Sequence, residues 1–153
     1  MKVTDFLGPD YIVSDLRSDT KSGVLGELAQ HLASKMTGVD AEALKRVLEE
    51  RELLASTAIG DGIAIPHGKL DAVGRLVGTL GRARAGVEFE SIDGKPTHLV
   101  FMLVAPANST GVHLKALARL SRLFRDSAFR DRLMAAADAP GMYQVIVEED
   151  AKY

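Results

Sequence analysis

One of the four histidines in the sequence, His67, stands between Pro66 and Gly68 in the stretch from Gly60 to Lys69. The preceding residues, Ile63-Ala64-Ile65, have the apolar and β-branched character of a short buried strand. Proline fixes its own φ and has no N–H to donate, and glycine permits a sharp exit, so we expect the strand to stop here. The pattern predicts that a stiffened loop backbone displays His67.

An imidazole held in this way can be a metal ligand, a general base, a nucleophile or a structural residue. The spacings that build zinc sites, His-Glu-x-x-His and His-x-His, are absent, and the chain has no cysteine. A Walker A loop is also excluded, because five residues separate Gly62 from Gly68 and Leu70 stands where Ser or Thr should bind magnesium. No Gly-x-Ser-x-Gly elbow is present for a hydrolase serine. These comparisons favour a nucleophile that takes and passes on a phosphoryl group, with a binding protein or a general-base hydrolase as alternatives.

The residues around His67 also carry a family resemblance. The run Glu52, six residues, Ile59-Gly60, two residues, and then Ile63 to Gly68 resembles the phosphohistidine signature of phosphotransferase-system (PTS) enzyme IIA domains of the fructose/mannitol class, type 2. The resemblance covers nearly the whole chain and is greatest with the free-standing nitrogen-regulatory members. It implies that His67 is the phosphorylated residue and that a small histidine phosphocarrier protein is the donor.

Arg51 stands immediately before Glu52, on a helix expected from Ala41 to about Leu53. It follows Val47 by four residues, which carries its guanidinium along the inward edge of that helix. The spacing allows a snorkelling side chain or a bidentate phosphate clamp. The resemblance favours the clamp, because an arginine before the signature's acidic residue accompanies the active histidine in this family. Glu52 is interpreted as a structural residue with a basic or backbone-donor partner.

His113 lies in the first turn of another expected helix, four residues before Leu117. It is either a packed core histidine or part of an anion site at the helix start. The family has a second histidine that opens a His-Leu-x-x-Leu-x-x-Leu helix, and the sequence from His113 matches it. This resemblance implies that His113 binds the phosphoryl group or steadies the ring of His67. The remaining two histidines, His31 and His98, are interpreted as structural.

The connection before the signature contains two hydroxyl residues and two departures from the usual family pattern. Ser56 and Thr57 either cap the nearby backbone or touch a phosphoryl oxygen. Ala58 replaces a common glycine, which puts the local turn in question. Asp61 stands where a neutral residue is frequent, and its charge would oppose an anionic phosphohistidine unless it points away.

The hydrophobic pattern predicts strands that alternate with helices, and the continuously apolar run Leu99 to Ala105 predicts a central strand covered on both faces. Expected strands lie near Tyr11 to Val13, at Ile63 to Ile65, at Leu76 to Ala83, at Val87 to Phe89 and at Leu99 to Ala105. Expected helices cover Ser22 to Thr37, Ala41 to Leu53, the segment from His113 to Phe124, Asp126 or Ser127 to Ala136, and a last one from Asp138, with Glu148 to Tyr153 frayed. We predict one α/β domain over residues 1–153, a three-layer αβα sandwich. The resemblance implies a central mixed sheet and the type-2 PTS IIA (mannitol IIA-like) fold, with His67, His113 and Arg51 at the edge of the sheet.

Composition limits the other functions open to the chain. Hydrophobic residues make up 46% and charged residues 26% of the 153, and the net charge of −2 gives no overall positive field for nucleic acid. No apolar run approaches the roughly 18 residues of a membrane span. We expect a cytoplasmic protein that needs no metal or other cofactor. The predicted function is phosphoryl relay with regulation of downstream proteins, and the alternative is transfer to a separate IIB component of a sugar permease.

Overall fold

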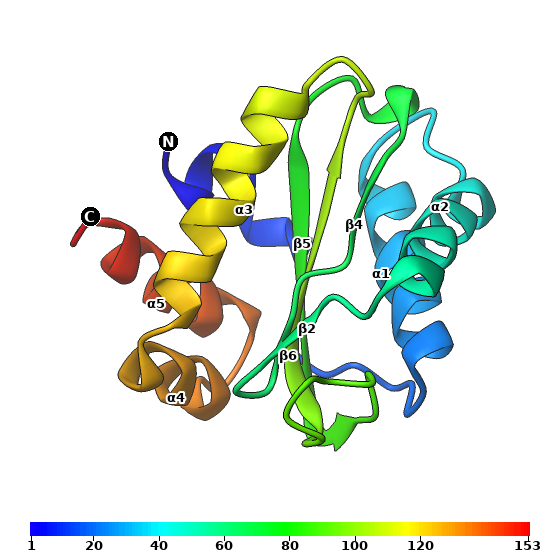
Figure 1. The fold of residues 1–153 in the computed structure, drawn as a ribbon. Helices are drawn as coiled ribbons and strands as arrows, with labels where there is room; N and C mark the ends of the chain where they lie inside the picture. The colour runs from blue at the N-terminus through cyan, green and yellow to red at the C-terminus, as the bar shows by residue number, and fades with distance from the viewer.

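The computed structural model describes residues 1–153 and shows a six-stranded sheet between two layers of helices (Figure 1). The helices are α1 (Lys21–Lys35), α2 (Ala41–Leu54), α3 (Thr110–Phe124), α4 (Ser127–Ala135) and α5 (Ala139–Asp150). The strands are β1 (Ile12–Val13), β2 (Ala58–Gly60), β3 (Ile63–Ala64), β4 (His67–Lys69), β5 (Val77–Val87) and β6 (Thr97–Ala105). Helices α1 and α2 cover one face and α3, α4 and α5 the other, which confirms the expected three layers. None of these helices has the length and apolarity that crossing a bilayer requires.

The sheet is mixed, as expected. Its strand order is β1-β5-β6-β3-β2, with β4 also paired to β6. The long pair β5 and β6 is antiparallel, whereas β1 is parallel to β5, and both β3 and β4 are parallel to β6. Strands β3 and β4 therefore follow one another along the same edge of β6.

Strand β6 divides the hydrophobic core into two halves, because successive side chains of a strand point to opposite faces. Leu99, Phe101 and Leu103 belong to the cluster that packs with α3, α4 and α5. The alternate residues of the strand belong to the cluster that packs with α1 and α2. Every residue from Leu99 to Ala105 is buried, so the expected central strand is confirmed.

The extent of two strands differs from the expectation. Strand β5 is one continuous element through Val87, because an irregularity between Arg82 and Val87 lets the strand rejoin β6 at Thr97. The expectation of a loop at His67 is also wrong. The missing N–H of Pro66 interrupts the β6 ladder only locally, and the chain then pairs with β6 again through β4.

The C-terminal segment is ordered further than expected. Helix α5 continues to Asp150, whose buried carboxylate accepts hydrogen bonds from the backbone N–H groups of Val3, at 3.1 Å, and Thr4, at 3.0 Å. The same carboxylate forms an ion pair with Arg119 at 2.8 Å. The prediction of fraying from Glu148 is therefore wrong up to Asp150, because this end of the helix caps the first turn of the chain.

Candidate functional site

His67 is the first residue of β4, and its ring is fixed by a short contact within its own chain segment. Nδ1 lies 2.8 Å from the carbonyl oxygen of Ile65. A carbonyl only accepts hydrogen bonds, so Nδ1 carries the proton and donates it. The second ring nitrogen, Nε2, is then unprotonated and holds the free lone pair. The half-buried imidazole is thus prepared as a nucleophile through Nε2.

Gly68 determines which way the neighbours of β4 point. A Cβ atom built on Gly68 would stand 2.7 Å from Cγ1 of Val47 on α2, closer than packed carbon atoms approach. The Gly68 position therefore faces α2. Because side chains alternate along a strand, His67 and Lys69 face the opposite way, toward α3.

His113 approaches His67 from α3. It is 5% exposed, and its ring centroid lies 5.4 Å from that of His67, with the ring planes at 80°. Neither ring nitrogen of His113 has a hydrogen-bond partner. Buried polar atoms normally have partners, and leaving one unpaired costs roughly 1–3 kcal/mol. This side chain is consequently ready to donate to a group that enters the site.

Burial keeps both imidazoles neutral. It lowers the pKa of His113 to about 4, with further lowering by His67 and by the Lys69 ammonium. Burial also lowers the pKa of His67, assisted by the positive charge of Arg51 and opposed by the hydrogen bond to Ile65. Neutral imidazole is the form whose Nε2 lone pair can attack an electrophile, so the lowered pKa of His67 favours a competent nucleophile at neutral pH, and neutral His113 keeps one N–H to donate.

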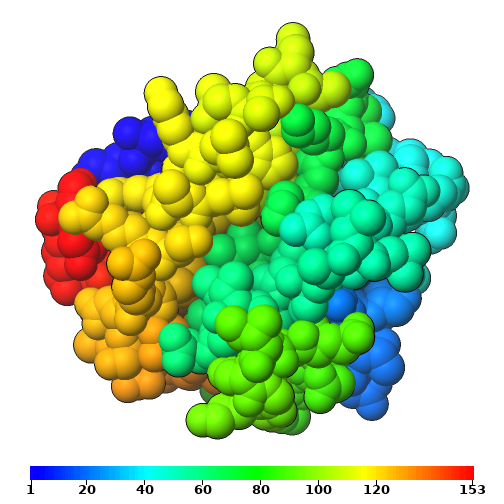
Figure 2. All heavy atoms as spheres, in the orientation of Figure 1, coloured from blue at the N-terminus to red at the C-terminus, as the bar shows by residue number.

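Arg51 completes the group that the sequence predicted. It lies in the last turn of α2, where its Nη1 donates to the carbonyl oxygen of Ala55 at 3.0 Å. An open depression of about 460 Å³ brings Arg51 together with both histidines. Figure 2 shows this face, with α3 and α2 on either side of the strands. The depression is lined by Val47, Glu50, Arg51, Leu54, His67, Gly68, Lys69 and His113.

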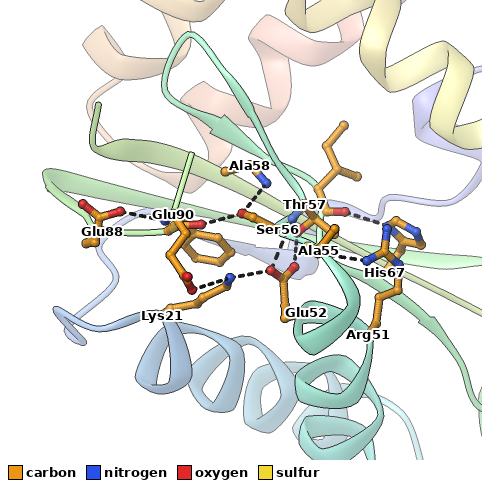
Figure 3. A network of polar contacts seen from close by, with 12 residues as sticks. Lys21, Arg51, Glu52, Ala55, Ser56, Thr57, Ala58, His67, Glu88 and Glu90 are labelled. Atoms are coloured by element: carbon orange, nitrogen blue, oxygen red, sulfur yellow. Dashed lines mark hydrogen bonds and ion pairs between the residues drawn. The ribbon is translucent and has the colours of Figure 1, made fainter. Parts of the chain in front are cut away.

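Ser56 and Thr57 lie outside this depression and take part in a separate polar network (Figure 3). The hydroxyl of Thr57 donates to the Glu52 carboxylate, which also accepts from the backbone N–H of Thr57 at 3.2 Å and pairs with Lys21 at 2.6 Å. The hydroxyl of Ser56 donates to the carbonyl of Phe89 and accepts from a backbone N–H. These contacts agree with the structural alternative for both hydroxyls and with the interpretation of Glu52.

The two departures from the family pattern leave the depression unaffected. Ala58 is buried within β2 and has no left-handed φ, so it needs no glycine. Asp61 has a φ of 56° and lines a different depression, with Ile59 and Arg125 among its neighbours. The other histidines make backbone contacts: Nε2 of His31 with the carbonyl of Asp10, and Nδ1 of His98 with that of Ala83.

Lys69 is a cationic residue of the depression that the sequence motifs did not indicate. Its Nζ donates to Oγ1 of Thr110, the first residue of α3, at 2.8 Å. The available signal was its position two residues after His67, which places both side chains on the same face if the segment is a strand. The expectation of a loop at His67 concealed that signal.

A mixed sheet that displays a free imidazole nitrogen beside an unpartnered histidine and a guanidinium defines a histidine-centred site for an anionic group. The sequence matches the family model "Phosphoenolpyruvate-dependent sugar phosphotransferase system, EIIA 2" over residues 5–149. The chain belongs to this type-2 EIIA family, which confirms the family that the signature indicated.

Individual relatives agree with this assignment. The chain is 42% identical to a nitrogen regulatory protein of Bradyrhizobium diazoefficiens over 146 residues, which is 95% of each chain. It is 37% identical over 150 residues to the fructose-specific EIIABC component of Bacillus subtilis, where the match covers 98% of this chain and 24% of that protein. The crystal structure of the nitrogen regulatory protein IIA-Ntr from Neisseria meningitidis is similar with a TM-score of 0.87 and 32% identity, covering 94% of this chain and 98% of that one.

The close contact of Gly68 with α2 predicts the effect of a single methyl group. Gly68→Ala should lower the free energy of unfolding by roughly 1–3 kcal/mol, because the new Cβ overlaps Val47. Adding Val47→Ala in the same chain should recover part of that loss by making room. Thermal and urea unfolding would measure both effects. Gly111→Ala is the matched control, since a Cβ there meets nothing within 4 Å; an equal loss in the control would contradict the contact.

The neutral state of His113 predicts a pH dependence of stability. The unfolded chain takes up a proton near the ordinary pKa of 6.5, whereas folded His113 does so only near about 4. Its contribution is therefore complete above pH 6.5 and is lost as the pH falls toward 4, with a loss of about 1 kcal/mol between about pH 7.5 and about pH 5.5. Urea unfolding of wild type and His113→Gln at both pH values would isolate this difference. Equal pH slopes in the two proteins would show that burial does not hold His113 neutral.

Proposed function

We propose that the protein is a phosphoryl carrier, in which Nε2 of His67 accepts a phosphoryl group from the phosphohistidine of a small histidine phosphocarrier protein. The observation that supports this most strongly is the pair of imidazoles. His67 has one nitrogen fixed and the other free, and His113 stands beside it with both nitrogens buried and unpartnered. This arrangement suits a group that arrives with acceptor oxygens.

The transfer requires no net proton movement. The Nε2 lone pair of His67 forms a bond to phosphorus as the N–P bond of the donor breaks, and that electron pair returns to the donor imidazole. His67 keeps its proton on Nδ1, so its ring becomes a phosphoimidazolium whose positive charge the Ile65 carbonyl stabilises. The free energy of phosphoryl transfer from one imidazole to another is close to zero. The protein therefore contributes mainly by aligning the reacting atoms and by placing positive charge near the phosphoryl group.

The neighbouring groups favour the moving phosphoryl group in different ways. His113 donates one N–H to a phosphoryl oxygen and so gains the partner that it lacks in the free protein. Arg51 makes a single hydrogen bond, to the neutral Ala55 carbonyl, and its remaining N–H groups are available to the anion. The phosphoryl group brings about −1.5 to −2 charges to these donors. The interactions speed the transfer to the extent that they are stronger in the transition state than in the bound ground state.

The assignment of His67 is tested by following phosphoryl transfer directly. Incubation with a phosphorylated histidine phosphocarrier protein should add one acid-labile phosphoryl group to the wild type and none to His67→Ala, as measured by intact-protein mass spectrometry. His31→Ala, which removes an unrelated histidine, should behave as wild type. Circular dichroism would check that His67→Ala remains folded. A full equivalent of phosphate on His67→Ala would refute the assignment.

We infer further that the phosphorylated state regulates other proteins. The relatives that match this chain over nearly their full length include nitrogen regulatory proteins, and one fructose-specific EIIA component is matched over 84% of its length. The rim of the depression also suits protein docking, because Leu54 is 82% exposed and Leu114, next to His113, is 61% exposed. A switch requires that a partner bind the two states with different affinity. Transfer to a separate IIB component is the alternative, which the similarity to the fructose-specific protein supports.

The two outcomes can be separated by presenting both protein states to a cytoplasmic extract. Regulation predicts partners that bind preferentially to either the phosphorylated wild type or the unphosphorylated His67→Ala, with affinities that differ at least about fivefold. Affinity capture with quantitative mass spectrometry would measure this preference. Rapid loss of the phosphoryl group to a sugar-specific membrane fraction, with no discriminating partner, would support the IIB alternative instead.

A further inference from the structure

The side chain of Lys69 brings an ammonium group to the depression that contains His67, and the transfer described above does not use it. It lies two residues after His67 in β4, and the contact of Gly68 with Val47 shows that His67 and Lys69 both face α3. The two Cα atoms are then separated by roughly 6.6 Å along the strand. A lysine side chain is long enough to bring its ammonium across that distance.

The present partner of Lys69 is weak for a cation. Nζ donates to the neutral hydroxyl of Thr110 at 2.8 Å, and no carboxylate pairs with it within the depression or outside it. The single acidic residue that lines the depression is Glu50, which forms no ion pair. Lys21, by contrast, is held by the carboxylates of Glu52 and Glu90. Lys69 is therefore an exposed, unneutralised cation whose hydrogen bond can be exchanged.

The negative charge of a phosphoryl group on His67 indicates a role for the Lys69 ammonium. A phosphoryl group on His67 introduces about −1.5 to −2 charges, and Arg51 supplies one positive charge while His113 is neutral. The three phosphoryl oxygens carry this negative charge and can accept charge-assisted hydrogen bonds beyond those of Arg51 and His113. Lys69 is placed to donate one, and its charge already acts within the site, because it contributes to the lowered pKa of His113.

We propose that Lys69 is a phosphoryl ligand: its ammonium leaves Thr110 Oγ1 and binds an oxygen of the phosphoryl group on His67. All three ammonium protons stay on the nitrogen, so the step exchanges one hydrogen bond for a stronger, charge-assisted one. The inference rests on the proposed phosphoryl transfer to His67. Lys69 then determines how strongly the protein retains the group relative to its donor.

The test measures the equilibrium of phosphoryl exchange with the phosphocarrier protein, which does not depend on docking rates. Lys69→Ala should shift that equilibrium toward the donor by about tenfold, as expected for loss of one charge-assisted hydrogen bond. Lys69→Arg should restore most of it. Lys115→Ala removes an equal charge from α3 but lines a different depression, and it should behave as wild type.

A second variant separates binding of the phosphoryl group from anchoring of α3. If Lys69 acts only by holding Thr110, then Thr110→Val should reproduce the loss seen in Lys69→Ala, and the proposal would be overturned. The proposal expects Thr110→Val to retain the phosphoryl group at least as well as wild type, because the competing acceptor is gone. NMR titration of unphosphorylated Lys69→Ala should show a raised His113 pKa, which confirms that the charge acts within the site.

The outcomes distinguish this inference from the function on which it rests. Failure of the wild-type protein to accept any phosphoryl group would refute the carrier function itself. Normal phosphorylation of wild type, together with an unchanged exchange equilibrium in Lys69→Ala, would refute the role of Lys69 and leave the carrier function standing.

Discussion

The position of the whole site depends on the pairing of β4 with β6. This short strand is held on one edge by the register of His67 with Leu103, and on one face by contact of Gly68 with α2. Strand β6 is itself fixed between two hydrophobic clusters, so β4 inherits a rigid support. Ile65 donates its N–H to the Thr57 carbonyl rather than to β6, and its own carbonyl accepts from the His67 ring, while the Pro66 carbonyl accepts from Leu103 of β6. These backbone contacts fix both the location and the tautomer of the His67 imidazole.

The electrostatic arrangement leaves the cations of the site without a carboxylate partner. Glu52 adjoins Arg51 in sequence, yet its carboxylate is directed into the network with Lys21 and Thr57 and does not neutralise the guanidinium (Figure 3). Arg51 and Lys69 are both satisfied by neutral oxygens. Burial of His113 without partners sacrifices roughly 1–3 kcal/mol of stability. Hydrogen-bond donors without a carboxylate partner suit an anion that occupies the site only part of the time.

Much of the fold was predictable because its signals are local and strongly periodic. The continuously apolar run from Leu99 identified the central strand, and the spacing of apolar residues identified the five helices. The family resemblance predicted a site of His67, His113 and Arg51, and the structure brings these three side chains to one depression. Spacing alone left the roles of Arg51 and His113 open, since an arginine or histidine on an inward helix edge also suits simple packing.

The missed features are those that depend on contacts between distant segments. Strand β4 exists because β6 offers it hydrogen-bonding groups, which no local propensity of a Pro-His-Gly sequence reveals. The order of the C-terminus depends on Asp150 accepting from Val3 and Thr4 at the opposite end of the chain. Arg82 is fully buried against the carbonyl oxygens at the end of α4, although an arginine in a strand pattern normally indicates an exposed position. In each case tertiary pairing overrode the local preference.

If the proposed regulatory function holds, the surface around His67 constrains the chemistry of the partner. Leu54 and Leu114 are largely exposed beside a site whose cations are not neutralised. In the unphosphorylated state, a partner gains by covering these apolar side chains and by bringing an acidic group to Arg51 and Lys69. Phosphorylation places its own anion in that position, so the acidic group of the partner would meet a like charge in a partly desolvated setting. The same surface would then reject that partner and favour one that presents a cation, which is how a single covalent group can exchange one set of partners for another.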